Sequence, residues 1–275
     1  MSEFCTSCGD DVLRFDHASL DISDSDLVSQ TLRRERPDVV INCAAWTDVD
    51  GCELDRERAF AANARGPENL ARGSRAVSAA FATISTDYVF NGRKEGFYTQ
   101  RDDPSPESVY GLSKLEGERR TQTTYDRTIV VRTGFVFGVG GNNFLSTIVE
   151  RARNGEKLKA IRDAWGTPTY ARDLAVRLRE LAVVDRPGIF HVVNDGDGVS
   201  YEEFARAALD LAGYATAELE SIEMKELHRP APRPENSRLR CLLSPAIGLA
   251  PMAFWKDSLS DFVALSSATE ATAKL

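Results

Sequence analysis

The stretch VVINCAA, residues 39–45, is a nearly continuous apolar run with the length of a β-strand. Such a run is typical of a strand that is buried on both faces of a parallel sheet. Other strands are predicted at 12–15, 81–85 and 129–137, and helical patterns lie at 24–36, 55–78 and 108–123. Because strands and helices alternate, the sequence predicts an α/β fold with a largely parallel sheet.

Beyond about residue 150 the pattern changes to short helices and brief strands. A helix is predicted from Asn143, and Gly66-Pro67 is expected to kink or split the earlier helix at 55–78. The stretch HRPAPRPENS, residues 228–237, is rich in proline and is therefore predicted to be an extended loop packed on a lobe. The remaining predicted elements are helices at 171–184 and 200–213 and a strand at 189–193.

The composition excludes several classes of function. The 34 basic and 42 acidic residues among 275 give a formal charge of -8, which does not attract nucleic acid or an anionic membrane. No apolar run reaches the roughly 18 residues of a membrane span, and the N-terminus does not resemble a secretory signal. The five cysteines have irregular spacing, which favours reduced thiols in a cytoplasm, and no metal site is predicted.

The residues that suggest chemistry lie in STDYVFNG, residues 85–92, and YGLSK, residues 110–114. Tyr110 and Lys114 are four residues apart, so they share one face of a helix, and a neighbouring ammonium is expected to lower the pKa of the phenol. Tyr110 could then act as a general acid or base. Thr86 or Ser85, at a strand end, could hydrogen-bond the same substrate oxygen. A Y-x-x-x-K pair also arises by chance as a solvated tyrosine and lysine.

Longer segments resemble the extended short-chain dehydrogenases, and within them the dTDP-4-dehydrorhamnose reductase family. They follow the order of that family from about residue 13 to residue 263. The segments are DVVINCAAWTDVDGCE (38–53), STDYVFNG (85–92), PESVYGLSKLEGE (106–118), VRTGFVFG (131–138), GNNFLSTI (141–148), DAWGTPTYARDLA (163–175), GIFHVVNDGDGVSYEEFA (188–205) and RPENSRL (233–239).

The resemblance implies an NADPH- or NADH-dependent reductase of a nucleotide-linked 4-keto-6-deoxy sugar. A homodimer is a possible assembly, because the sheet could borrow a strand from another copy. The resemblance also implies a Rossmann-like cofactor domain at 11–150, a mixed α/β substrate lobe at 151–265, and flexible tails at 1–10 and 266–275. The implied catalytic residues are Thr86, Tyr110 as proton donor, and Lys114. Tyr110 and Lys114 are also implied to contact the cofactor, together with Asp21, Ile22, Ala45, Trp46, Thr47 and Ile84. The implied substrate contacts are Thr86, Asp87, Phe135, Asn143 and Arg233, and Phe135 stands where the family usually has tryptophan.

One part of the family pattern does not occur in the sequence. The family begins with a strand, a G-x-x-G-x-x-G turn and a helix, whose backbone approaches the dinucleotide pyrophosphate. Here Gly9 is the only glycine before the strand at 39–45. Losing two or three charge-assisted hydrogen bonds would weaken cofactor binding by about 3–9 kcal/mol. The sheet is therefore predicted to lack its first strand, so that the strands at Val12 and Val39 pair directly, accept a strand from elsewhere, or leave a gap.

Two further interpretations follow from this difference. The chain could be a noncatalytic homologue that binds a sugar nucleotide or regulates another protein and has lost cofactor binding. Alternatively, its start could be an incomplete or altered form of a longer gene product.

Overall fold

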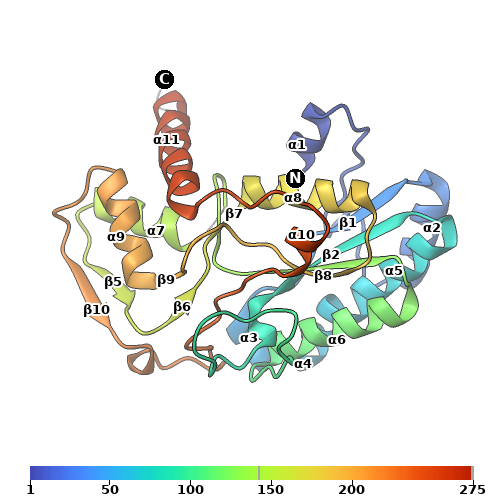
Figure 1. Cartoon of the computed structure of the whole chain (residues 1–275), viewed down its shortest axis with the longest axis horizontal. Coiled ribbons are helices and arrows are strands. Elements are labelled where there is room, and N and C mark those ends of the chain that lie inside the picture. The colour runs from blue at the N-terminus through green and yellow to red at the C-terminus, as the bar shows by residue number, and fades with distance from the viewer. Residues whose placement is uncertain (142, 274–275) are drawn as a thin grey trace.

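The structure is a computed structural model that describes residues 1–141 and 143–273, with only the backbone described for 267–273. Figure 1 shows a sheet covered by helices and, beside it, a smaller lobe from which the C-terminal helix projects. No helix in the described part of the chain combines the length and the apolar character needed to cross a bilayer.

The main sheet contains four parallel strands. They are β1 (Val39–Asn42), β2 (Ala80–Thr86), β3 (Thr128–Thr133) and β8 (Gly188–His191), in the order β1-β2-β3-β8. The prediction of a parallel α/β sheet is therefore confirmed. Within the described residues no strand pairs with the outer side of β1, which is an edge strand and only half-buried over Val39–Ile41.

The predicted strand at 12–15 is wrong. Residues 11–16 form no helix or strand, and the side chains of Leu13 and Phe15 are exposed. A strand needs a hydrogen-bonded neighbour, and strand-forming side chains do not replace one. Of the arrangements considered for the sheet, the described residues show the strand at Val39 without a partner on its outer side.

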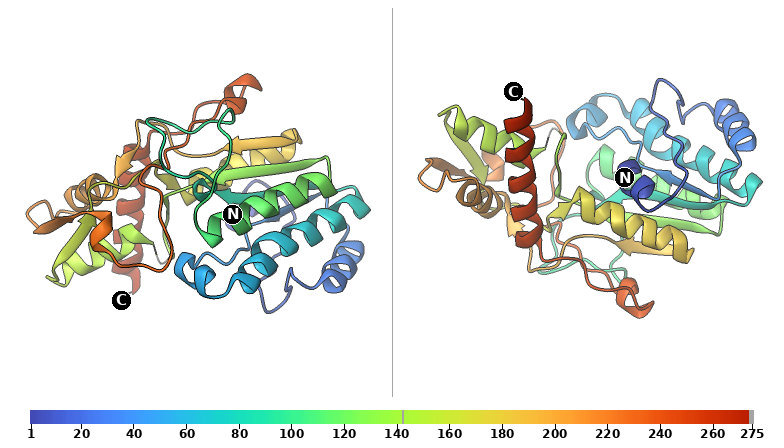
Figure 2. Two further views of the ribbon diagram at one scale, coloured as in Figure 1. Left: turned by 90° about the horizontal axis from the view of Figure 1, so that it is seen from below. Right: turned by 90° about the horizontal axis from the view of Figure 1, so that it is seen from above.

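Helices cover both faces of this sheet, as the two opposite views in Figure 2 show. On one face lie α2 (Ser25–Glu35), α5 (Gly66–Val77) and α6 (Val109–Thr124), and α8 (Ala171–Val184) covers the other. The helix predicted at 24–36 is confirmed as α2. Asp24 caps it by accepting hydrogen bonds from the backbone N–H groups of Asp26 and Leu27. The helices predicted at 108–123 and 171–184 are confirmed as α6 and α8.

The helix predicted at 55–78 is divided, as expected. It consists of α4 (Arg56–Phe60), a π-helical turn (Ala61–Arg65) and α5, and it follows α3 (Val49–Leu54). The division falls in the π turn immediately before Gly66. Such turns are rare and frequently occur at functional sites.

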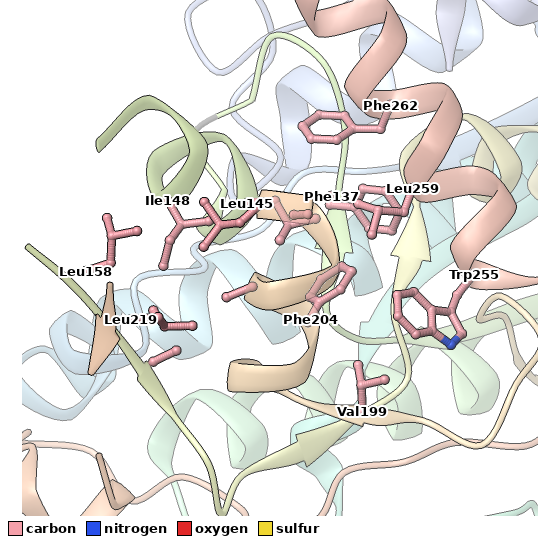
Figure 3. Close-up of a cluster of buried hydrophobic side chains, with 14 of the residues drawn as sticks. Phe137, Leu145, Ile148, Leu158, Val199, Phe204, Leu219, Trp255, Leu259 and Phe262 are labelled. Atoms are coloured by element: carbon pink, nitrogen blue, oxygen red, sulfur yellow. The ribbon is translucent and has the colours of Figure 1, made fainter. Parts of the chain in front are cut away.

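The smaller lobe has its own apolar core, drawn in Figure 3. Phe137, Leu145, Phe204 and Leu259 are almost completely buried in it. The helices of the lobe are α7 (Phe144–Arg153), α9 (Tyr201–Leu211) and α11 (Trp255–Ala273), and the short α10 (Leu243–Ala246) lies beside β8. Its strands pair as β5 (Leu158–Ile161) with β10 (Leu219–Ile222), β4 (Val136–Phe137) with β7 (Thr169–Tyr170), and β6 (Trp165–Gly166) with β9 (Val199–Ser200).

The strand predicted at 129–137 is interrupted, because β3 ends at Thr133 and β4 begins at Val136. Residues 228–237 contain no helix, as predicted for this proline-rich stretch. At the chain ends, α1 (Ser2–Ser7) is helical, Asp10 pairs with Arg179, and α11 continues to Ala273. Residues 274–275 lie outside the described residues. The domain boundaries and the flexibility of the tails stay predictions.

Candidate active site

Thr86, Tyr110 and Lys114 lie where β2 ends and α6 begins. Thr86 is the last residue of β2, and Tyr110 is the second residue of α6. The start of α6 is fixed by two acceptors, since Ser108 Oγ accepts from Gly111 N at 3.1 Å and Glu53 accepts from Val109 N at 2.6 Å.

Tyr110 is buried against aromatic and apolar groups. Its ring meets that of Tyr88 edge to face, with centroids 5.8 Å apart, in a cluster with Cys52 and Ala59. This burial raises the pKa of Tyr110, and a hydrogen bond with Thr86 opposes the increase. Tyr110 therefore keeps its proton at neutral pH.

The expectation that Lys114 lowers the pKa of Tyr110 is wrong for this structure. The Lys114 ammonium donates instead to the carbonyl oxygen of Ile84 at 2.7 Å. Burial lowers the pKa of Lys114 to about 8, while the nearby Glu118 carboxylate acts in the opposite direction. Shared position on a helix face did not determine which atoms the flexible lysine contacts.

Asp87 is a buried carboxylate that follows Thr86 directly. The Thr86 hydroxyl donates to Asp87 Oδ1 at 3.0 Å, and Thr86 Oγ1 accepts from Tyr88 N at 3.2 Å. Asp87 Oδ2 has no hydrogen-bond partner among the described residues. Burial raises the pKa of Asp87 to about 6. A ligand hydroxyl at this position could supply the missing hydrogen bond.

The segment after β1 is held against α6 by Asn63, which lies in the π turn. Asn63 Oδ1 accepts from Trp46 N at 2.8 Å, and its Nδ2 donates to Trp46 O at 3.0 Å and to Ser113 Oγ at 3.0 Å. Ala45 and Trp46 remain half-buried and Thr47 is exposed, so the predicted cofactor surface here is open.

Asp21 and Ile22 lie beside the start of α5. The Ile22 side chain fills the space where Gly66 lacks a Cβ, and its carbonyl accepts from Asn69 Nδ2 at 3.0 Å. Gly66 is three residues from Asn63, so Ile22 lies near the elements that hold Trp46. Asp21 accepts hydrogen bonds from both the backbone and the hydroxyl of Ser23.

A cavity of about 740 Å³ lies next to Tyr88, which contacts Tyr110. Phe135 lines this cavity, and its ring stacks on that of Tyr201 with centroids 4.2 Å apart. Its backbone has a φ of +45°, which is uncommon for a bulky residue. The Phe135 ring occupies the space where a Cβ on Gly166 would lie. Backbone strain of this kind concentrates at ligand sites.

Arg233 connects the proline-rich segment to the sheet domain. Its guanidinium pairs with both oxygens of Asp50, at 2.5 and 2.9 Å, and Ala231 N donates to Asp50 Oδ1 at 3.0 Å. The hydrogen bonds from Arg233 lower the pKa of Asp50 to about 2. Arg233 and Arg229 both line the cavity, which therefore has cationic groups suited to an anionic ligand.

A family model described as the RmlD substrate binding domain matches residues 2–267. The chain belongs to this family. Proteins similar to it include the spore coat polysaccharide biosynthesis protein SpsK of Bacillus subtilis, with 34% identity over 93% of this chain and 89% of that protein. The dTDP-4-dehydrorhamnose reductase of Mycolicibacterium smegmatis is 37% identical over 93% of this chain and 78% of its own.

Solved structures agree with this family assignment. A dTDP-4-dehydrorhamnose reductase ortholog from Clostridium acetobutylicum superposes with a TM-score of 0.92 at 34% identity, covering 96% of this chain and 93% of that chain. The Bacillus anthracis dTDP-4-dehydrorhamnose reductase, solved in complex with NADP, gives 0.89 at 33% identity, covering 92% and 89%. The resemblance stated from the sequence is confirmed.

Within this family member, the structure brings some predicted residues together and separates another. Phe135 and Arg233 both line the cavity, whereas Asn143 is not among the described residues that line it. Asn143 caps α7 by accepting from Ser146 N at 3.1 Å, and its Nδ2 donates to Gly138 O at 2.9 Å. These bonds use the side chain for the fold, and its substrate contact stays a prediction.

The sequence analysis missed several residues of this site. Asn63 gave a signal, because it is a polar residue inside the alanine-rich stretch AFAANA, residues 59–64. Tyr88 lies inside the quoted STDYVFNG motif and was not assigned a role. Trp165, Tyr201 and Arg229 also line the cavity, but they gave no signal of their own, because only the fold brings them beside Phe135.

Proposed function

We propose that this protein reduces the 4-keto group of a dTDP-linked 4-keto-6-deoxy sugar with NADPH or NADH. Relatives named dTDP-4-dehydrorhamnose reductase are 36–37% identical to it, and a similar structure holds NADP. The observation that carries the proposal is the position of Thr86, Tyr110 and Lys114 where β2 ends and α6 begins, with Tyr110 in contact with Tyr88, which lines a large cavity.

The residues present fit the nicotinamide and ribose end of such a cofactor. Lys114 has one hydrogen-bond acceptor among the described residues, the Ile84 carbonyl, so it keeps donors for ribose hydroxyls. Ala45, Trp46 and Thr47 supply the adjoining surface after β1, and the cofactor, when bound, supplies a hydride. For the pyrophosphate, no glycine-rich turn occurs among residues 1–38, which precede β1.

In the proposed reaction Tyr110 is the proton donor. Its raised pKa keeps the phenol protonated until negative charge develops on the C4 oxygen. The O–H bond of Tyr110 then breaks, and the proton moves to that oxygen. Thr86 orients the oxygen through its hydroxyl, and the Lys114 ammonium stabilises the phenolate that remains.

The cavity accounts for recognition of the nucleotide sugar. Arg229 is placed to pair with a diphosphate, because guanidinium groups bind phosphate oxygens in a bidentate manner, and Arg233, whose terminal nitrogens pair with Asp50, lines the same cavity. The stacked rings of Phe135 and Tyr201 provide an apolar face for the sugar or the base. Asp87 precedes Tyr88, which lines the cavity, and its buried Oδ2 lacks a partner among the described residues, so we assign it a hydrogen bond from a sugar hydroxyl.

The experiment is NADPH consumption with dTDP-4-keto-rhamnose, comparing wild type with Tyr110→Phe. The variant keeps the ring and loses the proton, so kcat should fall by about 10²–10⁴-fold. Tyr125→Phe is the matched control, because this buried tyrosine donates to Ala79 O at 3.0 Å in another cluster; its kcat should match wild type. No turnover by wild type at saturating cofactor would refute the proposal.

A second candidate function is binding of a sugar nucleotide without hydride transfer. The unpaired outer side of β1 and the lack of a glycine-rich turn among residues 1–38 favour it. Calorimetric titration separates the two functions. Binding of NADPH at micromolar concentration supports the reductase, and binding of the sugar nucleotide alone supports this candidate.

The predicted setting of the protein belongs to the same proposal. We infer a cytoplasmic enzyme that acts without nucleic acid or membrane, from its charge of -8 and its irregular cysteines. A homodimer is the predicted assembly. Size-exclusion chromatography with light scattering measures the mass, and a value of one chain would contradict the dimer.

A further inference from the structure

Glu118 is a buried carboxylate that continues the line of Tyr110 and Lys114 along α6. The three residues are spaced four apart, so they lie on one face of the helix. Glu118 is only 3% exposed. A carboxylate at this depth requires strong partners, because burial of an unpaired charge is very unfavourable.

The partners of Glu118 come from two neighbouring strands. Ser85 Oγ, on β2, donates to Glu118 Oε1 at 2.5 Å. Arg132, on β3, donates to Oε1 from Nε at 2.9 Å and to Oε2 from Nη2 at 2.7 Å. One carboxylate therefore joins α6 to both strands in a geometry with little freedom to shift.

The position of Ser85 gives this connection a chemical consequence. Ser85 stands between Ile84, whose carbonyl accepts from Lys114, and Thr86, the predicted partner of the substrate oxygen. The end of β2 is thus attached to α6 at two successive residues, through Glu118 and through Lys114. Both bonds set the distance between Thr86 on the strand and Tyr110 on the helix.

The charge of Glu118 also acts on Lys114. Burial disfavours the ammonium, and the Glu118 carboxylate one helical turn away favours it. The ion pair with Arg132 places a compensating positive charge beside this buried carboxylate.

We infer that Glu118 is a positioning residue for the reduction. With Ser85 and Arg132, it holds the end of β2 at the spacing from α6 that lets Thr86, Tyr110 and Lys114 face one substrate oxygen. The expected change in kcat rests on the proposed function. The attachment of β2 to α6 through Glu118 does not.

The first experiment is Ser85→Ala. This change removes the hydrogen bond from Ser85 to Glu118 and leaves the ion pair between Arg132 and Glu118 intact. We expect kcat to fall about tenfold with little change in KM, since a hydrogen bond to a charged group is lost and a catalytic geometry loosens. Ser85→Thr, which keeps the hydroxyl, should restore kcat. Ser74→Ala is the matched control, because Ser74 Oγ is buried and has no partner among the described residues. An unchanged kcat in folded Ser85→Ala would overturn the inference.

The second experiment needs no substrate. The Lys114 side chain is titrated by NMR in wild type and in Glu118→Gln, and it should lose its proton at lower pH in the variant. Identical titration curves would contradict the role of Glu118. Absence of turnover by wild type would refute the reductase alone, and this titration would still test the inference. If Glu118→Gln does not fold, the Lys114 titration is carried out in Ser85→Ala instead. A shifted titration curve is expected, because the contact between Ile84 and Lys114 loosens, and an unchanged curve would contradict the inference.

Discussion

Replacing Gly117 with alanine should destabilise this protein, although alanine is the better helix former. Gly117 lies in the middle of α6, where it faces the π turn. A Cβ built on Gly117 would overlap the backbone carbonyl oxygen of Asn63. Since that atom belongs to the backbone, the whole turn or the helix must move to relieve the overlap.

The size of the effect follows from two opposing contributions. Alanine in a helix interior gains about 1 kcal/mol over glycine. Overpacking of a close backbone contact costs about 3 kcal/mol, at the upper end of the usual range. The net loss of about 2 kcal/mol corresponds to a fall in Tm of roughly 4–8 °C for a chain of this size. Because Asn63 also holds Trp46, turnover by the folded variant should decrease.

The assay is urea unfolding and calorimetry of Gly117→Ala beside Gly73→Ala. Gly73 is also internal to a helix, but the one atom that an added Cβ there would overlap is the terminal methyl of Leu32, at 2.5 Å, which belongs to a side chain and not to the backbone. Gly73→Ala should therefore remain within about 1 kcal/mol of wild type. The reasoning is refuted if Gly117→Ala is as stable as wild type, or if both variants lose the same stability.

Two further predictions concern charges at the site. Because burial raises the pKa of Asp87 from 3.8 to about 6, ionisation of Asp87 destabilises the folded wild type as pH rises through that window, by about 2.5 kcal/mol between pH 4 and pH 7. Asp87→Asn does not titrate, so urea unfolding at pH 4 and pH 7 should show its stability relative to wild type increasing by that amount; a constant difference would contradict the burial argument. Arg233→Lys keeps the charge but loses the bidentate pair with Asp50, so KM for the nucleotide sugar should rise about tenfold with kcat nearly unchanged. Steady-state kinetics checks this, and an unchanged KM would remove Arg233 from the proposed binding surface.

Local signals in the sequence predicted most of the fold. The helix at 24–36 was marked by its capping aspartate, and the helix at 108–123 starts at Ser108, which caps it. The apolar runs at 81–85 and 129–133 became buried strands because both faces of the sheet are covered. Capping and burial are properties of short segments, so a single sequence contains the information for them.

The errors arose where structure depends on a neighbour. VVINCAA was interpreted as a fully buried strand, but an apolar run shows only that burial is possible, and β1 lies at the edge of the sheet. Residues 12–15 have strand-forming side chains and no strand to pair with. The strand predicted at 129–137 is interrupted between β3 and β4, where Phe135 has a positive φ. Nothing about phenylalanine indicates that conformation.

The candidate site divides in the same way. Thr86, Tyr110 and Lys114 were predicted because strand ends and helical spacing can be read from the sequence. Asn63 and Tyr201 reach the site through a turn and a second lobe, so their positions required the fold.

The difference between the expected and observed environment of Tyr110 suggests how the site avoids early ionisation. If Lys114 contacted the phenol directly, it would favour the phenolate before substrate arrives, and a phenolate cannot donate a proton. In the structure the ammonium is bound to the Ile84 carbonyl, and Glu118 holds the neighbouring Ser85. Burial raises the pKa of the Tyr110 phenol, which therefore stays neutral. Only when charge develops on the substrate oxygen does transfer of that proton become favourable, and the nearby ammonium then stabilises the phenolate that forms.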